Sequence, residues 1–223
     1  MRRVADETSD AEDRRPKREV TLGKAMVLLA FQAIGMVAIG RLLWVWSDRA
    51  ASRFVTIGLG EIIQGLALGM ALIGLAFTLF RSFPRVSDRL VRMQAETYAF
   101  LGPRLGLTAI VFISLCAGVG EEALFRGGLQ TYLGDHVGAP AAIALSSAMF
   151  AAIHLGKPPI TALLFVVGAI FGAVFWLTDS LFAVMIGHTL YDVWALRYLH
   201  REFVRLGLVG AEDAPLANPV GES

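Results

Sequence analysis

The chain has 223 residues, of which 56% are hydrophobic, and its formal net charge is +1 at pH 7. Together with a mean hydropathy of +0.61, this composition excludes an ordinary soluble globular protein. The charge gives no sign of a nucleic-acid partner, and none is expected. The single cysteine, Cys116, excludes an internal disulfide and a cysteine-based metal site, and we expect it to be a small buried core residue.

Segment 1–24 is highly charged, with seven Lys or Arg and six Asp or Glu residues. Such a segment cannot bury enough apolar surface to fold alone, so we predict a disordered cytosolic tail. Its mixed charge and the long apolar run that follows are unlike a cleavable signal peptide. The sequence therefore predicts that the chain stays in the lipid bilayer, with a membrane domain over 25–203 and a C-terminal tail over 204–223.

Six apolar runs have the length of transmembrane helices. Segment 81–104 differs, because arginines alternate with apolar residues, and this pattern is typical of an amphipathic helix on the membrane surface. The predicted fold is an all-α polytopic membrane helix bundle with about six transmembrane helices and one interfacial helix. The runs are 25–46, 62–80, 105–132, 139–155, 160–177 and 181–197.

The distribution of Lys and Arg predicts the orientation. In the six-span arrangement most basic residues lie on one side, which by the positive-inside rule puts both termini in the cytosol. Arg49 and Arg53 lie on the other side. The Arg-, Ala- and Gly-rich composition favours a bacterial inner membrane.

Small residues one turn apart predict close helix packing at Gly65-x3-Gly69 and Gly168-x3-Gly172. Gly127-Gly128 would permit a bend in its helix.

Glu121, Glu122 and Arg126 lie inside an apolar run, where ionisable groups are costly unless they pair or line a cavity. Glu122 and Arg126 are four residues apart and share a helix face. Glu121 points about 100° away from Glu122, so it is left facing a cavity, as a general base acting on water requires. The alternative is that both acids share Arg126 as a structural pair.

Two later runs each hold a pair spaced by four residues, Phe150 with His154 and His188 with Asp192. Both members of a pair can reach the same point. Taken without the other motifs, His154 could be a core histidine whose hydrogen bonds are made within the protein. His188 could likewise form only a structural hydrogen bond with Asp192 in its own helix. From the helical rise, Glu121, His154 and His188 all fall near the middle of the bilayer, so one cavity could collect them.

The motifs Glu-Glu-x3-Arg, Phe-x3-His and His-x3-Asp, in this order over 105–200, resemble the CPBP family of intramembrane proteases. This family includes the CAAX prenyl endopeptidases of the Rce1 type and the bacterial Abi proteins. The resemblance implies that Glu121 and His154 activate the attacking water, and that His188 and Asp192 stabilise the oxyanion or position the scissile carbonyl. Glu122, Arg126 and Phe150 would support this site.

Asp192 departs from the eukaryotic prenyl proteases, which have Asn at this position. An aspartate donates a hydrogen bond only when protonated, so the oxyanion role fits His188 better than Asp192.

A catalytic Zn²⁺ is an open alternative, with Glu121, His154 and His188 as its ligands. The chain has no His-Glu-x2-His motif. We favour a reaction without a cofactor, in which Glu121 is the base and His154 orients the water.

The predicted function is an endopeptidase that cleaves membrane-associated or CAAX-like peptide and protein substrates. One alternative is a non-enzymatic membrane scaffold or immunity protein, against which the complete motif set argues. The other is a proton-coupled carrier, which the lack of an evident two-half repeat disfavours. The sequence does not specify an oligomeric state.

Overall fold

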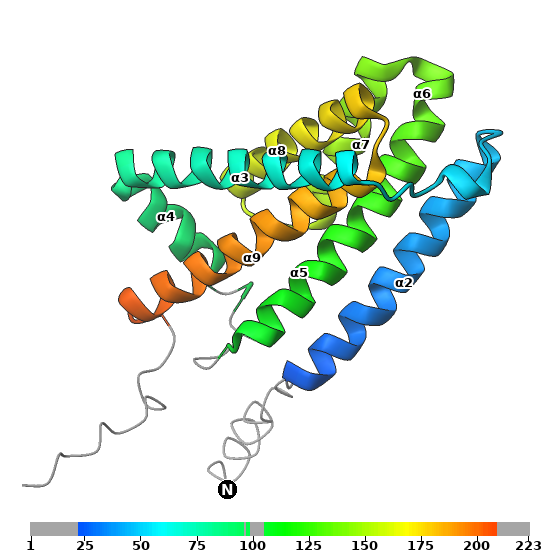
Figure 1. Ribbon diagram of the computed structural model, residues 1–223. Coiled ribbons are helices and arrows are strands. Elements are labelled where there is room, and N and C mark those ends of the chain that lie inside the picture. Colours follow the sequence, from blue (N-terminus) through cyan, green and yellow to red (C-terminus); the bar gives the residue numbers. More distant parts are fainter. Residues whose placement is uncertain (1–21, 96, 99–104, 209–223) are drawn as a thin grey trace, which may run out of the picture.

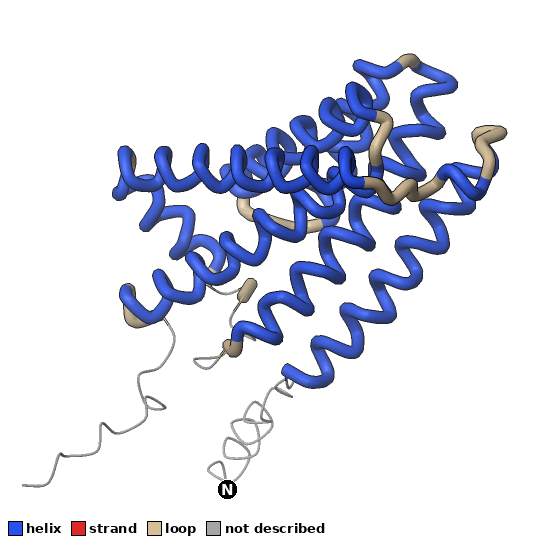
Figure 2. Tube along the Cα trace, viewed as in Figure 1, coloured by secondary structure: helices blue, strands red, loops and turns tan. Residues whose placement is uncertain are grey.

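The computed structural model describes residues 22–95, 97–98 and 105–208, which form helices joined by short loops (Figure 2). No β-strand occurs in this part of the chain, so the predicted all-α fold is confirmed. Segments 1–21 and 209–223, which contain most of the two predicted tails, lie outside the described residues. The elements are α2 (Leu22–Trp46), η1 (Ala51–Arg53), α3 (Leu59–Ser82), α4 (Pro84–Gln94), α5 (Leu107–Glu122), the π-helix η3 (Ala123–Gln130), α6 (Thr131–Val137), α7 (Ala139–Ile153), α8 (Pro158–Thr178) and α9 (Leu181–Arg205).

Among the described residues, four helical segments are long and apolar enough to cross a membrane. They are α2, α3, α8 and the continuous helix Leu107–Val137 that α5, η3 and α6 form together. Helix α7 has only 15 residues, and α9 carries five charged residues from Asp192 to its end. The predicted number of six spans therefore stays a prediction.

Polar and apolar side chains are distributed as in a membrane protein. Glu122 and Arg126 have no exposed surface, whereas Phe31 and Met70 are 71% and 60% exposed. Burying charge while exposing large apolar groups would be unfavourable in water and is expected where the outer surface contacts lipid.

Helices that are far apart in the sequence pack together around α5 (Figure 1). Helix α5 packs against α2 on one side and α9 on the other, and α9 also packs against α3. Helices α7 and α8 pack against each other and contact η3. The last of the described helices, α9, therefore lies beside the helix that carries Glu121.

Glycines set the closest helix approaches. A Cβ on Gly40 of α2 would collide with the carbonyl oxygen of Ala123, and one on Gly128 would lie 2.7 Å from Gly40 Cα. Gly65 and Gly69 face α9, where added Cβ atoms would lie 2.6 Å and 2.8 Å from side-chain atoms of that helix. The predicted close packing at these two glycines is confirmed.

The interfacial helix is shorter than predicted. It covers 11 residues, Pro84–Gln94, and not all of 81–104. Phe83 has φ −126° and ψ 63°, which ends α3, and Pro84 then starts a new helix, where its missing N–H costs nothing. Residues 96 and 99–104 of the predicted segment lie outside the described residues.

Gly127 and Gly128, where the sequence would permit a bend, lie in the π-helix η3. In this π-helix the side chains of Arg126 and Gln130 both point towards α8. Arg126 Nη2 donates to the carbonyl of Gly168 at 2.8 Å, and Gln130 Nε2 donates to that of Gly172 at 2.9 Å. The small residues at 168 and 172 thus leave room for two buried polar side chains as well as for helix packing.

Candidate active site

Glu121 and Glu122 end α5 and face different surroundings, as the sequence predicts. Glu121 lines a cavity of about 310 Å³, whereas Glu122 points into the protein and is fully buried. The walls of this cavity come from α2, α3, α4, α5, α7, α8 and α9, and apolar side chains form most of them. One carboxylate therefore faces the cavity, and the other lies behind it.

Glu122 is paired with Arg126, as predicted. Its Oε1 lies 3.3 Å from Arg126 Nη1, and both side chains have no exposed surface. The guanidinium Cζ lies 4.8 Å from the ring centroid of Phe150 and 5.8 Å from that of Phe171. Two aromatic rings and the Gly168 carbonyl thus hold the buried cation in place.

Glu122 also contacts His188, which spacing along the sequence does not predict. Its Oε1 lies 2.8 Å from His188 Nδ1, across 66 residues. The imidazole stacks on Phe171, with ring centroids 4.8 Å apart and an interplanar angle of 18°. Glu122, which is itself paired with Arg126, and Phe171 therefore fix the orientation of His188.

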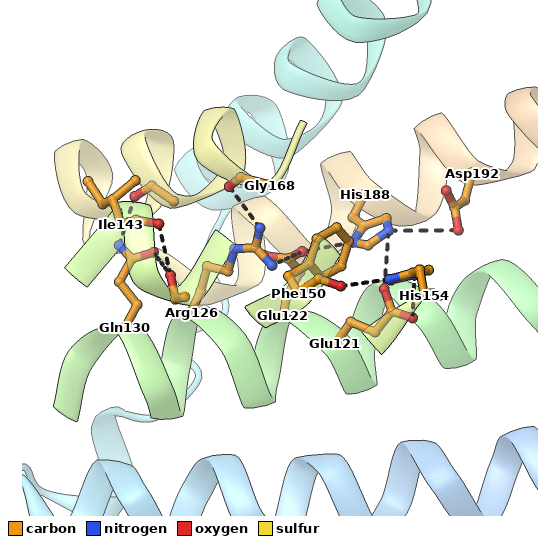
Figure 3. Close-up of polar contacts among 12 residues, drawn as sticks. Glu121, Glu122, Arg126, Gln130, Ile143, Phe150, His154, Gly168, His188 and Asp192 are labelled. Carbon is orange, nitrogen blue, oxygen red and sulfur yellow. Dashed lines mark hydrogen bonds and ion pairs between the residues drawn. The ribbon is translucent and has the colours of Figure 1, made fainter. Parts of the chain in front are cut away.

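The other nitrogen of His188 faces the cavity and two further acids (Figure 3). Nε2 lies 3.8 Å from Glu121 Oε2 and 3.7 Å from Asp192 Oδ2. Both distances are too long for a direct hydrogen bond. The expected alternative, a His188–Asp192 hydrogen bond that only stabilises the helix, is therefore not what the side chains form.

His154 lies just after α7, and its ring also faces Glu121. Its Nε2 is 4.0 Å from Glu121 Oε1, and its Nδ1 is 2.7 Å from the carbonyl oxygen of Phe150. Because a carbonyl only accepts, Nδ1 carries the hydrogen and Nε2 of the neutral ring carries the lone pair. The main chain of Phe150 thus sets the tautomer of His154.

All four predicted catalytic side chains reach the same cavity wall, although three different segments supply them. Asp192 and His154 are the most exposed of the four, with side-chain exposures of 25% and 27%. Glu121 and His188 lie deeper, at 14% and 6%. The four groups therefore line a path from the cavity into the helix bundle.

Three residues of the site were missed from sequence. Phe171 of α8 stacks on His188 and lies 5.8 Å from the Arg126 guanidinium, and Gln130 of η3 donates to the Gly172 carbonyl of the same helix α8. A lone Gln in an apolar run was a signal available for Gln130. Tyr98 also lines the cavity, and burial raises the pKa of its phenol to about 12, with smaller contributions from Asp192 and Glu121. Tyr98 is therefore neutral at physiological pH.

Cys116 is not the buried core residue that we expected. It is half-buried and lines the same cavity as Glu121. Five residues separate the two, a rise of about 7.5 Å along α5.

The residues proposed as Zn²⁺ ligands do not form a ligand cage as they are placed. In a tetrahedral zinc site with bonds of about 2.0–2.1 Å, two ligand atoms lie about 3.3 Å apart. Glu121 instead lies 4.0 Å from His154 Nε2 and 3.8 Å from His188 Nε2. Within the described part of the chain, no group of three or more His, Cys, Asp or Glu residues could hold a metal ion.

Comparison with known families identifies the segment that carries this site. Residues 103–194 match the family model described as type II CAAX prenyl endopeptidase Rce1-like. This segment of the chain belongs to the Rce1-like family. The resemblance drawn from the three motifs is thereby confirmed, and the match supports a CAAX-type intramembrane endopeptidase at the level of the family.

The Rce1-like segment extends from just before α5 to Trp194, so it includes Glu121, His154, His188 and Asp192. Helices α2, α3 and α4 precede it, yet they supply walls of the same cavity. No curated protein and no solved structure matches the chain.

Proposed function

We propose that this protein hydrolyses peptide bonds within or beside the membrane, with Glu121 as the general base that activates water. The observation that carries the proposal is the position of the Glu121 carboxylate on the cavity wall, facing Nε2 of both His154 and His188. A carboxylate so placed can take a proton from a water that attacks a substrate in the cavity.

The attacking water would lie between Glu121 and His154. Their facing atoms are 4.0 Å apart, a separation at which one water can donate a hydrogen bond to each. The lone pairs of its oxygen then point towards the substrate carbonyl. As the oxygen–carbon bond forms, Glu121 takes the proton, and it later gives this proton to the amine nitrogen when the carbon–nitrogen bond breaks.

His188 would stabilise the negative oxygen of the tetrahedral intermediate. Three carboxylates, from Glu121, Glu122 and Asp192, surround its ring. Charge balance favours an imidazolium, which donates from Nδ1 to Glu122 and from Nε2 to the oxyanion. Asp192, at 3.7 Å from Nε2, would position this ring and the scissile carbonyl.

We propose that this reaction needs no metal, because the four side chains supply a base, a water-orienting group and an oxyanion donor. Proposed substrates are peptides or membrane proteins whose apolar residues fit the cavity. They include CAAX-like C-terminal segments.

We propose that both termini lie in the cytosol, in a bacterial inner membrane. Leu22 packs in one cluster with Leu196, so the two ends of the described bundle lie on one side. Arg49, an exception to the charge bias, lies 3.5 Å from Asp135, which offsets its charge.

The test is cleavage of a membrane-derived or CAAX-like peptide by the purified protein in lipid vesicles. Glu121→Gln keeps the shape of the side chain but removes the base, so it should abolish cleavage while the thermal unfolding midpoint stays near that of the parent. Glu61→Gln, the same change in the first turn of α3, is the matched control and should keep full activity. If Glu121→Gln retains activity within about tenfold, a barrier change of only ~1.4 kcal/mol, Glu121 is not the base.

A further inference from the structure

A basic groove lies on α4, on the side of this helix that does not face the catalytic cavity. Its volume is about 470 Å³, and it lies between α4 and the loop that precedes α8. Four of its six lining residues are basic. The lining residues are Arg85, Asp88, Arg89, Arg92, Met93 and Lys157.

The three arginines of the groove carry charge that no described side chain offsets. Arg85, Arg89 and Arg92 form no ion pair or side-chain hydrogen bond with another described residue. The spacing of four and three residues places them on one helix face, where like charges repel. Asp88, the acid in the groove, is engaged by Arg205 from α9. An anion from outside the chain would therefore stabilise this face.

The groove lies where two candidate spans end. Helix α4 begins two residues after α3 ends at Ser82, and Lys157 immediately precedes α8. Beside the arginines, Phe83 and Val86 are 58% and 54% exposed. The same surface thus offers cations for a phosphate and apolar side chains for acyl chains, at the depth of the lipid head groups.

We propose that this groove binds the phosphate-bearing head group of an anionic phospholipid. An acidic peptide fits less well, because it would have no use for the exposed apolar residues next to the cations. The opposite face of α4 contributes Ser87, Leu90 and Val91 to the wall of the catalytic cavity. A lipid in the groove would therefore hold in place a helix that also shapes the substrate site.

The experiment is native mass spectrometry of the full chain in a neutral detergent, titrated with phosphatidylglycerol or with phosphatidylcholine. Lipid binding is read directly, so the result does not depend on protease activity. The test variant combines Arg85→Gln, Arg89→Gln and Arg92→Gln. The control combines Lys24→Gln, Arg197→Gln and Arg201→Gln, which removes the same charge from exposed positions on the same side of the bundle.

We expect the parent and the control to prefer phosphatidylglycerol, and the test variant to bind it at least about tenfold more weakly, since each basic residue near an anionic lipid contributes about fivefold. Changing the three arginines to Lys should keep the preference, which separates charge from folding.

Equal phosphatidylglycerol binding by the test variant and the control would overturn the proposal. Complete displacement of the lipid by millimolar glycerol 3-phosphate would also overturn it, since it would indicate a site for free phosphate. So would a test variant that keeps lipid binding but loses binding of an acidic peptide.

Discussion

Glu122 Oε1 lies 2.8 Å from His188 Nδ1, so a fully buried carboxylate joins the proposed oxyanion donor to Arg126. The three groups form one continuous polar chain, with the guanidinium at the end away from the cavity. Stability and activity therefore depend on Glu122 in different ways.

Arg126→Ala should lower stability by about 3–5 kcal/mol, because it leaves Glu122 as an unpaired buried charge. The double change Glu122→Gln with Arg126→Met removes both charges and should recover part of this loss, as measured by thermal unfolding in detergent. It should not recover activity, because His188 loses the carboxylate on Nδ1. If the double variant is no more stable than Arg126→Ala, the two residues do not act as a pair.

Gly40→Ala should destabilise the protein by about 1–3 kcal/mol, the usual cost of overpacking a close contact. The added Cβ would collide with the carbonyl of Ala123, directly after Glu122. Gly35→Ala in the same helix is the control, because a Cβ there meets no atom within 4 Å. Unfolding midpoints of the two variants should differ by several degrees, with activity reduced only for Gly40→Ala. Equal midpoints would show that α2 does not pack this closely on η3.

Modification of Cys116 should block cleavage. The half-buried thiol lines the catalytic cavity, so a maleimide attached to it would occupy the space that the substrate needs. Activity should fall in step with the extent of labelling measured by mass spectrometry. Cys116→Ser should retain activity and resist the reagent, and inhibition of this variant would mean that another group is the target.

Chelation separates the two mechanisms considered for Glu121 and His154. If these residues activate water without a metal, a strong chelator leaves the rate unchanged, and elemental analysis finds far less than one zinc per chain. His154→Ala should still abolish cleavage, because the water loses its second hydrogen-bond partner. The opposite result would be one zinc per chain, together with activity that is lost on chelation and returns when zinc is added. That result would assign the activation of water to the metal.

The helical class, the pairing of Glu122 with Arg126 and the exposure of Glu121 to a cavity could all be predicted from sequence. They depend on the length of apolar runs and on residues within one or two turns of each other, and local helix geometry fixes these features. The Rce1-like motifs are likewise local patterns, each read within six residues.

The π-helical turn after Glu122, the end of α4 at Gln94 and the place of Cys116 in the cavity were not predicted. Each depends on how neighbouring helices pack, which periodicity within one segment does not report.

The sequence by itself determined that this chain is a helical membrane protein with Glu121, His154, His188 and Asp192 in its apolar runs. Only the tertiary structure decided how they meet. Close contacts at Gly40 and Gly65 bring α2 and α3 against the α5–η3 helix and α9, and α9 in turn packs beside α5. That packing sets His188 between Glu122 and the cavity, because a contact across 66 residues depends on helix approach and not on spacing along one helix.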